Sequence, residues 1–171
     1  VRYLEDANGD GVYDKSTLFL DGLSFPNGCL PWRKGVLVTC APEVFYAEDT
    51  DGDGRADVRQ QLYTGFGEGN QQHRVNHPRW GLDNWVYLAN GDGGAGANGI
   101  VRSVLKPDAQ LDIRGRDLRI RPDDGSLDVV TGQAQYGRNR DDWGNWFGCD
   151  NNRPIWYYAV DDRYIRRNPH V

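Results

Sequence analysis

The apolar residues of this chain occur in short runs rich in β-branched and aromatic side chains. No window places apolar residues at helical spacing for more than a turn or two. Gly, Asn, Asp and Pro stand between the runs, as turns require. The pattern predicts an all-β chain. We expect strands over Thr17–Leu20, Val36–Thr39, Val44–Ala47, Gln61–Thr64, Trp85–Leu88, Ile100–Ser103, Leu118–Arg121, Leu127–Val130 and Ile155–Tyr158.

One segment of the sequence repeats. Glu5–Asp14 recurs as Glu48–Asp57, 43 positions later, and each copy is followed by a strand pattern and a Gly. A period of about 40 to 50 residues built from strands is typical of β-propeller blades. At this period the chain holds about four blades, the low end of the range of closed rings, so we expect an open arc of blades and not a closed ring. The predicted blade-like units are residues 1–24, 25–66, 67–121 and 122–171.

Composition and charge restrict the possible partners. The 171 residues carry a net charge of -5, which argues against a nucleic-acid-binding surface, because such a surface needs an excess of Lys and Arg. The apolar runs are far shorter than a membrane-spanning helix, so we expect no membrane contact by this chain itself. Because the sequence begins with Val1 and contains no Met, we expect a single partial domain of a longer protein.

Three cysteines leave two possibilities open. If Lys34-Gly35 forms a two-residue hairpin turn, Cys29 faces Cys40 across the two strands. Such a pair could form a disulfide, although bridges between directly opposed residues are strained. The alternative is a pair of buried thiols.

Both copies of the repeat place oxygen ligands at loop positions 1, 3, 5, 7 and 9, with Gly at position 6 for the turn, and this donor set suits calcium. Neither copy has Glu at position 12, so we expect a calcium loop within a β-hairpin and not an EF-hand. The alternative is a solvated Asp/Gly turn. The candidate ligands are Asp49, Asp51, Asp53, Arg55 (through its carbonyl) and Asp57 in one loop, and Asp6, Asn8, Asp10, Val12 (through its carbonyl) and Asp14 in the other.

A second polar segment covers residues 65–87. Its Gly-rich loop carries more Asn, Gln, His and Arg than a turn needs, and binding sites on propellers lie in such loops. His73 is a candidate general base, and Arg74 or Arg79 could hold an anionic group. A structural hydrogen-bonding role for His73 is the alternative. Gln72 and Asn76 are further candidates for binding substrate or cofactor.

The third polar segment covers residues 135–154. Arg138 and Arg140 could clamp a multiply charged cofactor, or they could form ion pairs with nearby aspartates that stiffen the loop. We expect the tryptophans of this region to pack between blades and not to stack on a ligand. They are Trp143, Trp146 and Trp156.

Several long motifs resemble one family. The stretches Glu48–Asp57, Thr64–Asn76 and Arg79–Tyr87 resemble the N-terminal propeller of the bacterial PVC-type membrane-bound dehydrogenases, and so do residues 132–148 and 162–171. That propeller is in turn similar to the glucose/sorbosone dehydrogenases, which are six-bladed and use pyrroloquinoline quinone.

The resemblance implies a periplasmic or otherwise extracytoplasmic oxidoreductase that oxidises a sugar or polyol. The Gly-x-Asp-x-x-φ-Tyr pattern of that family maps onto Gly81–Tyr87, which makes His73 the base. Arg74 and Arg138 would then contact substrate or quinone, and the Asp-rich loops would hold calcium. Haem-binding segments of the family lie outside this chain, which has no Cys-x-x-Cys-His. The alternative is a non-catalytic, calcium-stabilised propeller that binds carbohydrate or a partner protein.

Overall fold

The computed structural model describes residues 1–91, 99–168 and 170. Nearly all of its regular elements are strands, and every pairing is antiparallel, so the all-β fold class is confirmed. The strands are β1 (Arg2–Glu5), β2 (Lys15–Leu18), β3 (Gly28–Trp32), β4 (Gly35–Cys40), β5 (Glu43–Glu48), β6 (Val58–Thr64), β7 (Asn76–Trp80), β8 (Val86–Ala89), β9 (Ile100–Ser103), β10 (Gln110–Asp112), β11 (Asp117–Arg121), β12 (Ser126–Val130), β13 (Arg138–Arg140), β14 (Trp146–Gly148) and β15 (Trp156–Tyr157). A short 3₁₀ helix, η1 (Gln71–His73), and one α-helix, α1 (Asp162–Ile165), complete the elements. No helix among the described residues is long and apolar enough to cross a membrane.

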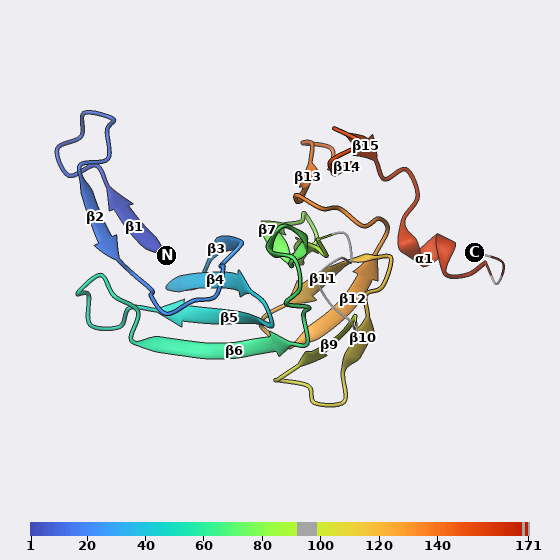
Figure 1. Cartoon of the computed structure of the whole chain (residues 1–171), viewed down its shortest axis with the longest axis horizontal. Coiled ribbons are helices and arrows are strands. Elements are labelled where there is room, and N and C mark those ends of the chain that lie inside the picture. The colour runs from blue at the N-terminus through green and yellow to red at the C-terminus, as the bar shows by residue number, and fades with distance from the viewer. Residues whose placement is uncertain (92–98, 169, 171) are drawn as a thin grey trace.

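The strands form four sheets (Figure 1). β1 and β2 form a hairpin, β3 to β6 pair in chain order, β7, β8, β11 and β12 form the next sheet, and β13 to β15 form the last. The β9–β10 hairpin lies between β8 and β11 in the sequence but pairs with β6 of the preceding sheet. β3 and β4 contact β7, and β13 contacts β7 and β8. The three sheets that begin with β3, β7 and β13 therefore adjoin through the first strand of each.

The predicted blade boundaries can be placed on these sheets. Strands β3 to β6 fall within the unit 25–66, and the second sheet extends from Asn76 to Val130, beyond the expected boundary at residue 121. The described sheets do not close into a ring (Figure 1). The division into blades stays a prediction.

The central strands of the sheet of β3 to β6, β4 and β5, are buried on both faces. Successive side chains of a strand point to opposite faces, and here both sets are apolar. Leu37, Val44 and Tyr46 pack into a core shared with β8 and β11, where Leu88, Leu118 and Ile120 are also fully buried. Val38, Cys40, Phe45 and Ala47 pack on the other face against the segment that follows β2, which includes Phe19, Leu20 and Leu23. Burial on both faces explains the continuous apolar runs of β4 and β5.

All nine predicted strands overlap observed ones. Six observed strands carry no comparable apolar run and are therefore not among the predicted ones. They are β1, β3, β7, β10, β13 and β14. β7 is the most irregular, because it contains Pro78 and its register shifts between Asn76 and Arg79, where His77 has a φ of 53°. The helix α1 begins where Asp161 caps the N–H of Arg163, a short signal that the apolar pattern does not reveal.

The expected pairing of Cys29 with Cys40 is wrong. The β3–β4 turn consists of Arg33 and Lys34, not of Lys34 and Gly35, and Arg33 adopts a φ of 54°. The register is therefore shifted by two residues, and Cys29 faces Val38. All three cysteines are free thiols; Cys29 is exposed, and Cys40 is buried.

Candidate functional site

His73 lies at the end of η1 and belongs to a polar network. Its Nε2 is 3.3 Å from Gln135 Nε2, which also donates to the Tyr136 hydroxyl at 2.9 Å. The amide orientation of Gln135 follows from its Oε1, which accepts the backbone N–H of Asn151 at 3.2 Å. The amide nitrogen is therefore the donor, and His73 Nε2 is the acceptor. The Tyr136 hydroxyl in turn donates to Asn151 Oδ1 at 2.6 Å.

An open cavity of about 330 Å³ lies beside this network. It is formed where β3 and β7 begin and where η1 and Tyr136 approach them. None of its lining side chains is a carboxylate, an ammonium or a guanidinium. They are Asn27, Gln71, Gln72, Asn76, His77 and Tyr136. Amide, imidazole and phenol groups can donate and accept hydrogen bonds with uncharged polar ligands.

Two predicted binding residues hold this region together. Arg74 is buried and donates to the carbonyl oxygens of Ser24 at 3.3 Å and Glu68 at 2.6 Å. Asn76 Nδ2 donates to the carbonyls of Arg74 at 2.9 Å and Gln135 at 2.8 Å. Arg74 is therefore directed to the loops and not to the cavity, whereas Asn76 both anchors the loops and lines the cavity.

The other residues of the predicted loop lie at the surface of the same region. Gln72 is exposed at the cavity, and its N–H donates to the side chain of Asn70 at 3.0 Å. Arg79 Nε donates to His77 Nε2 at 3.1 Å. His77 Nε2 also lies 3.2 Å from Asn139 Oδ1. These contacts connect β7 with β13 across the boundary between two sheets.

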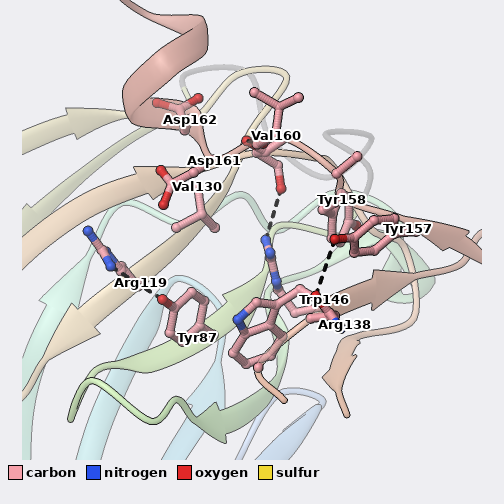
Figure 2. Close-up of a pocket in the computed structure, with 14 residues that line it drawn as sticks. Tyr87, Arg119, Val130, Arg138, Trp146, Tyr157, Tyr158, Val160, Asp161 and Asp162 are labelled. Carbon is pink, nitrogen blue, oxygen red and sulfur yellow. Dashed lines mark hydrogen bonds between the residues drawn. The ribbon is translucent and has the colours of Figure 1, made fainter. Parts of the chain in front are cut away.

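Arg138 lies elsewhere, in a second pocket of about 220 Å³ between the β8–β11–β12 sheet and residues 157–162 (Figure 2). Its guanidinium is 3.2 Å from the buried carboxylate of Asp117 and donates to the Thr131 carbonyl at 3.1 Å. The rings of Tyr87, Trp146 and Tyr158 surround it, with centroids between 4.5 and 5.5 Å from its Cζ. Such rings stabilise a cation through their electron-rich faces.

Asp117 is fully buried and joins several elements. It accepts the backbone N–H groups of Asn90 at 2.8 Å and Ala134 at 3.1 Å, as well as the Tyr158 hydroxyl at 3.4 Å. Burial raises the pKa of this carboxyl to about 6, although the Arg138 charge opposes that rise. The pair Asp117–Arg138 therefore connects β11 with β13 through a buried polar contact.

Arg140 donates to the carbonyls of Trp80 at 3.2 Å and Asp141 at 3.1 Å. Arg74, Arg138 and Arg140 are thus all bound by protein groups, and Arg138 takes part in an ion pair. The arginines that the sequence suggested for a quinone therefore do not form an open anion clamp, and these residues do not fit that cofactor as predicted.

The Asp-rich loop 49–57 joins β5 to β6, two paired strands. Its Asp49, Asp51 and Asp57 each offer a carboxylate oxygen within 4.8 Å of the others. The N–H groups of Gly54 and Gly52 donate to the two oxygens of Asp49 at 2.8 and 2.7 Å, and these bonds lower the pKa of its carboxyl. Three carboxylate groups this close fit a hard divalent cation. Asp53 and Arg55 lie in the same turn, where Asp53 Oδ1 accepts the Arg55 N–H at 2.7 Å.

The loop 6–14 joins β1 to β2 in the same manner. The carboxylate of Asp6 accepts N–H groups of Gly9 at 2.7 Å and Gly11 at 2.8 Å, and the bond from Gly11 contributes most to its lowered pKa. Asp10 Oδ1 accepts the N–H of Val12 at 2.8 Å, and Asp14 Oδ1 accepts that of Ala7 at 2.9 Å. Asn8 Oδ1 likewise accepts the N–H of Asp10 at 2.9 Å within the turn. The turn hydrogen bonds match those of the second copy.

Sequence reasoning missed several residues of the region around His73. Gln135, Tyr136 and Asn151 stand within the third polar segment, but nothing in their spacing indicates that they meet His73. Asn27 precedes an unpredicted strand. The expectation that Trp143 packs between sheets is wrong, because it is 85% exposed at the β13–β14 turn. Trp146, by contrast, stacks on Tyr87 of the neighbouring sheet with centroids 4.2 Å apart.

Comparison with protein-family models identifies the family of this chain. The family model called "Domain of unknown function (DUF7133)" matches residues 1–171, and the chain belongs to this family. No curated protein and no solved structure matches the chain.

Proposed function

We propose that this member of the DUF7133 family is an arc of a β-propeller that binds a neutral sugar or polyol at the inner ends of its sheets, as part of an extracytoplasmic oxidoreductase. The propeller arrangement is supported by successive antiparallel sheets that adjoin through β3, β7 and β13, the first strand of each. It is also supported by the repeat, because both Asp-rich loops connect the two strands of a hairpin.

The cavity lining carries the ligand proposal. Its polar groups are amides, an imidazole and a phenol, and no charged side chain lines it. A charged ligand would have no counter-ion there and would lose its hydration without compensation. A polyhydroxylated neutral molecule matches these groups, because each hydroxyl both donates and accepts a hydrogen bond.

His73 supports the oxidoreductase part of the proposal. Its Nε2 is an acceptor in the network that includes Tyr136, a residue of the cavity. In sugar oxidation a substrate hydroxyl would replace Gln135 at this nitrogen and give up its proton to it, and the hydride would pass to an acceptor. The resemblance suggests a quinone for that acceptor, but Arg74, Arg138 and Arg140 do not present an open site for it. A haem domain as electron partner and the extracytoplasmic location rest on the resemblance alone.

Calcium belongs to the same proposal as a stabilising ion. Asp49, Asp51 and Asp57 would hold it in one loop, and Asp53 and the Arg55 carbonyl are the further candidates that the sequence offers there. The non-catalytic alternative, a calcium-stabilised propeller that binds carbohydrate, needs the same cavity and the same loops but no role for His73.

Binding is tested by calorimetry on the full-length protein with a panel of neutral sugars and polyols, and with sugar acids of the same size. We expect binding of at least one neutral compound and none of the acids. Gln72→Ala should weaken binding, whereas Gln110→Ala, at an exposed position of β10, should not. Equal affinity for the acids, or equal loss in both variants, would contradict the cavity assignment.

Oxidation and calcium are tested separately. Dye reduction by the sugar that binds should require His73 and be lost in His73→Gln while sugar binding persists. If the wild type binds sugar and reduces no dye with added quinone and calcium, the non-catalytic alternative holds.

Calcium binding is tested by calorimetric titration, in which the heat of binding should fall in Asp57→Asn. An unchanged heat of binding in this variant would leave only a solvated turn.

A further inference from the structure

The β1–β2 hairpin stands apart from the other sheets. Among the described residues no further strand pairs with either of its edges, and it extends away from the sheet of β3 to β6 (Figure 1). Tyr3 and Leu4 of β1 are 54% and 47% exposed. A two-stranded hairpin is marginally stable in water and gains independent stability from a third strand or a packed layer. The hairpin therefore has the features of an incomplete sheet.

The repeat shows which strands the hairpin corresponds to. The 43-residue offset places the four residues of β1 on the last four of β5, and those of β2 on the first four of β6. The registers agree as well, because Glu5 pairs with Lys15 as Glu48 pairs with Val58. Since β5 and β6 follow β3 and β4 in their sheet, β1 and β2 correspond to the third and fourth strands of a sheet.

The edge of β5 that corresponds to the free edge of β1 is occupied. There β4 pairs with β5 from Glu43 to Ala47. Tyr46 and Ala47 are buried at this edge, whereas Tyr3 and Leu4, which stand at the same positions of the repeat, are exposed. The two copies thus share a Tyr and an apolar residue, but only the second copy has a strand beside them among the described residues.

The free edge of β1 carries backbone groups that suit a further strand. The Val1 carbonyl accepts the Phe19 N–H at 3.1 Å, and the Glu5 carbonyl accepts an N–H of the same hairpin. In an antiparallel pair the backbone groups of alternate residues point to opposite edges. Those of Arg2 and Leu4 therefore point away from β2. In the second copy the corresponding residues lie opposite β4.

A cavity of about 460 Å³ adjoins the same edge. Tyr3 and Thr17 of the hairpin line one side of it, and Val36 and the Asp-rich loop after β5 line the other. In the second copy Leu37 of β4 lies opposite Tyr46, and both pack into the core against the next sheet. An apolar side chain opposite Tyr3 would lie on the face that borders the cavity. Protein interiors rarely leave such a volume unfilled.

From these observations we infer that the free edge of β1 is the docking site of an antiparallel strand, which the full-length polypeptide supplies from outside residues 1–171. This strand corresponds to β4. Its backbone pairs with Arg2 and Leu4, and an apolar side chain opposite Tyr3 fills the cavity. Strand pairing at this edge needs neither the sugar cavity nor calcium, so either proposal can fail without the other.

The length of β1 favours a strand of the same polypeptide over a second copy of the chain. β1 has four residues, and pairing along four residues buries far less than the roughly 800 Å² per partner of a stable interface. A covalently connected strand needs no such area, because the connection gives it a high effective concentration.

Hydrogen exchange of the full-length protein tests the pairing. The matched reference is the free edge of β10, where the N–H groups of Gln110 and Asp112 point away from β9, since Ile113 donates to Gly99. We expect the Leu4 N–H to exchange at least about tenfold more slowly than this reference. Exchange of Leu4 as fast as that of the β10 edge would overturn the inference.

A pair of proline variants tests which edge is used. Leu4→Pro removes an N–H from the proposed docking edge without removing a bond to β2, and it should accelerate exchange of the Arg2 N–H about tenfold or more. Ser16 lies opposite Leu4 in the register, so Ser16→Pro removes an N–H from the other edge of the hairpin. It should leave the Arg2 N–H protected. Equal acceleration in both variants would contradict the assignment of the edge.

Photo-crosslinking of the otherwise unchanged protein identifies the occupant. With benzoylphenylalanine in place of Tyr3, we expect mass spectrometry to find a segment of the same polypeptide, with a yield that does not change on dilution. The same replacement at Tyr13, which is 70% exposed, should capture no such segment. Capture of a second copy or of another protein would overturn the assignment to the same polypeptide. No capture at Tyr3 would overturn the docking site itself.

Discussion

The sheet of β3 to β6 and the sheet of β13 to β15 are stabilised by different forces. The first has apolar side chains on both faces, and Leu37, Phe45 and Ala47 are fully buried within it. The second is a set of short strands held by the Asp117–Arg138 pair and by aromatic rings stacked across the sheet boundary, among them Tyr87 and Trp146. The apolar sheet depends on area removed from water, whereas the polar sheet depends on a few specific contacts.

The largest effect should come from the apolar sheet. Phe45→Ala removes a fully buried ring and should lower the free energy of unfolding by about 3 to 5 kcal/mol. Chemical denaturation measures the loss, and hydrogen exchange should show it in β4 and β5. Tyr13→Ala, at a 70% exposed position, should stay within about 0.5 kcal/mol of the wild type. A loss below about 1 kcal/mol for Phe45→Ala would mean that the sheet does not depend on this core.

The next effect tests the polar sheet. Arg138→Ala leaves the Asp117 carboxylate buried without its cation, which should cost about 3 kcal/mol at neutral pH. Because the pair links β11 with β13, exchange protection should fall in β13 and β14 while β4 and β5 keep theirs. Adding Asp117→Asn to Arg138→Ala should recover part of the stability, since the unpaired charge is then gone. Equal loss of protection in both sheets would contradict the comparison.

The smallest effect is a dependence on pH. Burial raises the pKa of Asp117 to about 6, so between pH 4 and 6 the folded state binds a proton that the unfolded state does not. The stability that this group contributes therefore increases as pH falls through that range. We expect the stability of the wild type relative to Asp117→Asn to rise by about 1 to 2 kcal/mol between pH 6.5 and 4.5. If that difference shrinks instead, Arg138 outweighs burial at this carboxyl.

The contrast also explains what could be predicted from the sequence. Strands β4, β5 and β8 carry apolar runs whose pattern is local, so their positions follow from the residues themselves. β13 consists of Arg138, Asn139 and Arg140, and its strand conformation depends on partners at distant positions. In the same way the repeat located both Asp-rich loops and their hairpins, because the aspartates and turn glycines of each loop lie within nine residues.

Only part of the candidate site could be predicted from the sequence. The composition of the segment around His73 indicated a polar site, and Gln72 and Asn76 do line the cavity. The contact of His73 with Gln135 spans 62 positions, and no local pattern encodes such a pairing. The charge of Arg74 and Arg138 makes both residues candidates for binding an anionic group, but the orientation of each side chain depends on carbonyl and carboxylate groups contributed by other elements.

The β9–β10 hairpin has a consequence for the behaviour of the protein at high concentration. The hairpin pairs with Tyr63 and Thr64, at the apolar end of β6. The part of β6 that does not pair with the hairpin carries the polar residues Arg59 and Gln60. The outermost strand is then β10, three residues long and followed by the Asp112–Arg114 ion pair. An exposed apolar edge recruits other chains by strand addition, and short or charged edges resist it. The hairpin thus protects the chain against edge-to-edge aggregation at the place where its main core reaches the border of a sheet.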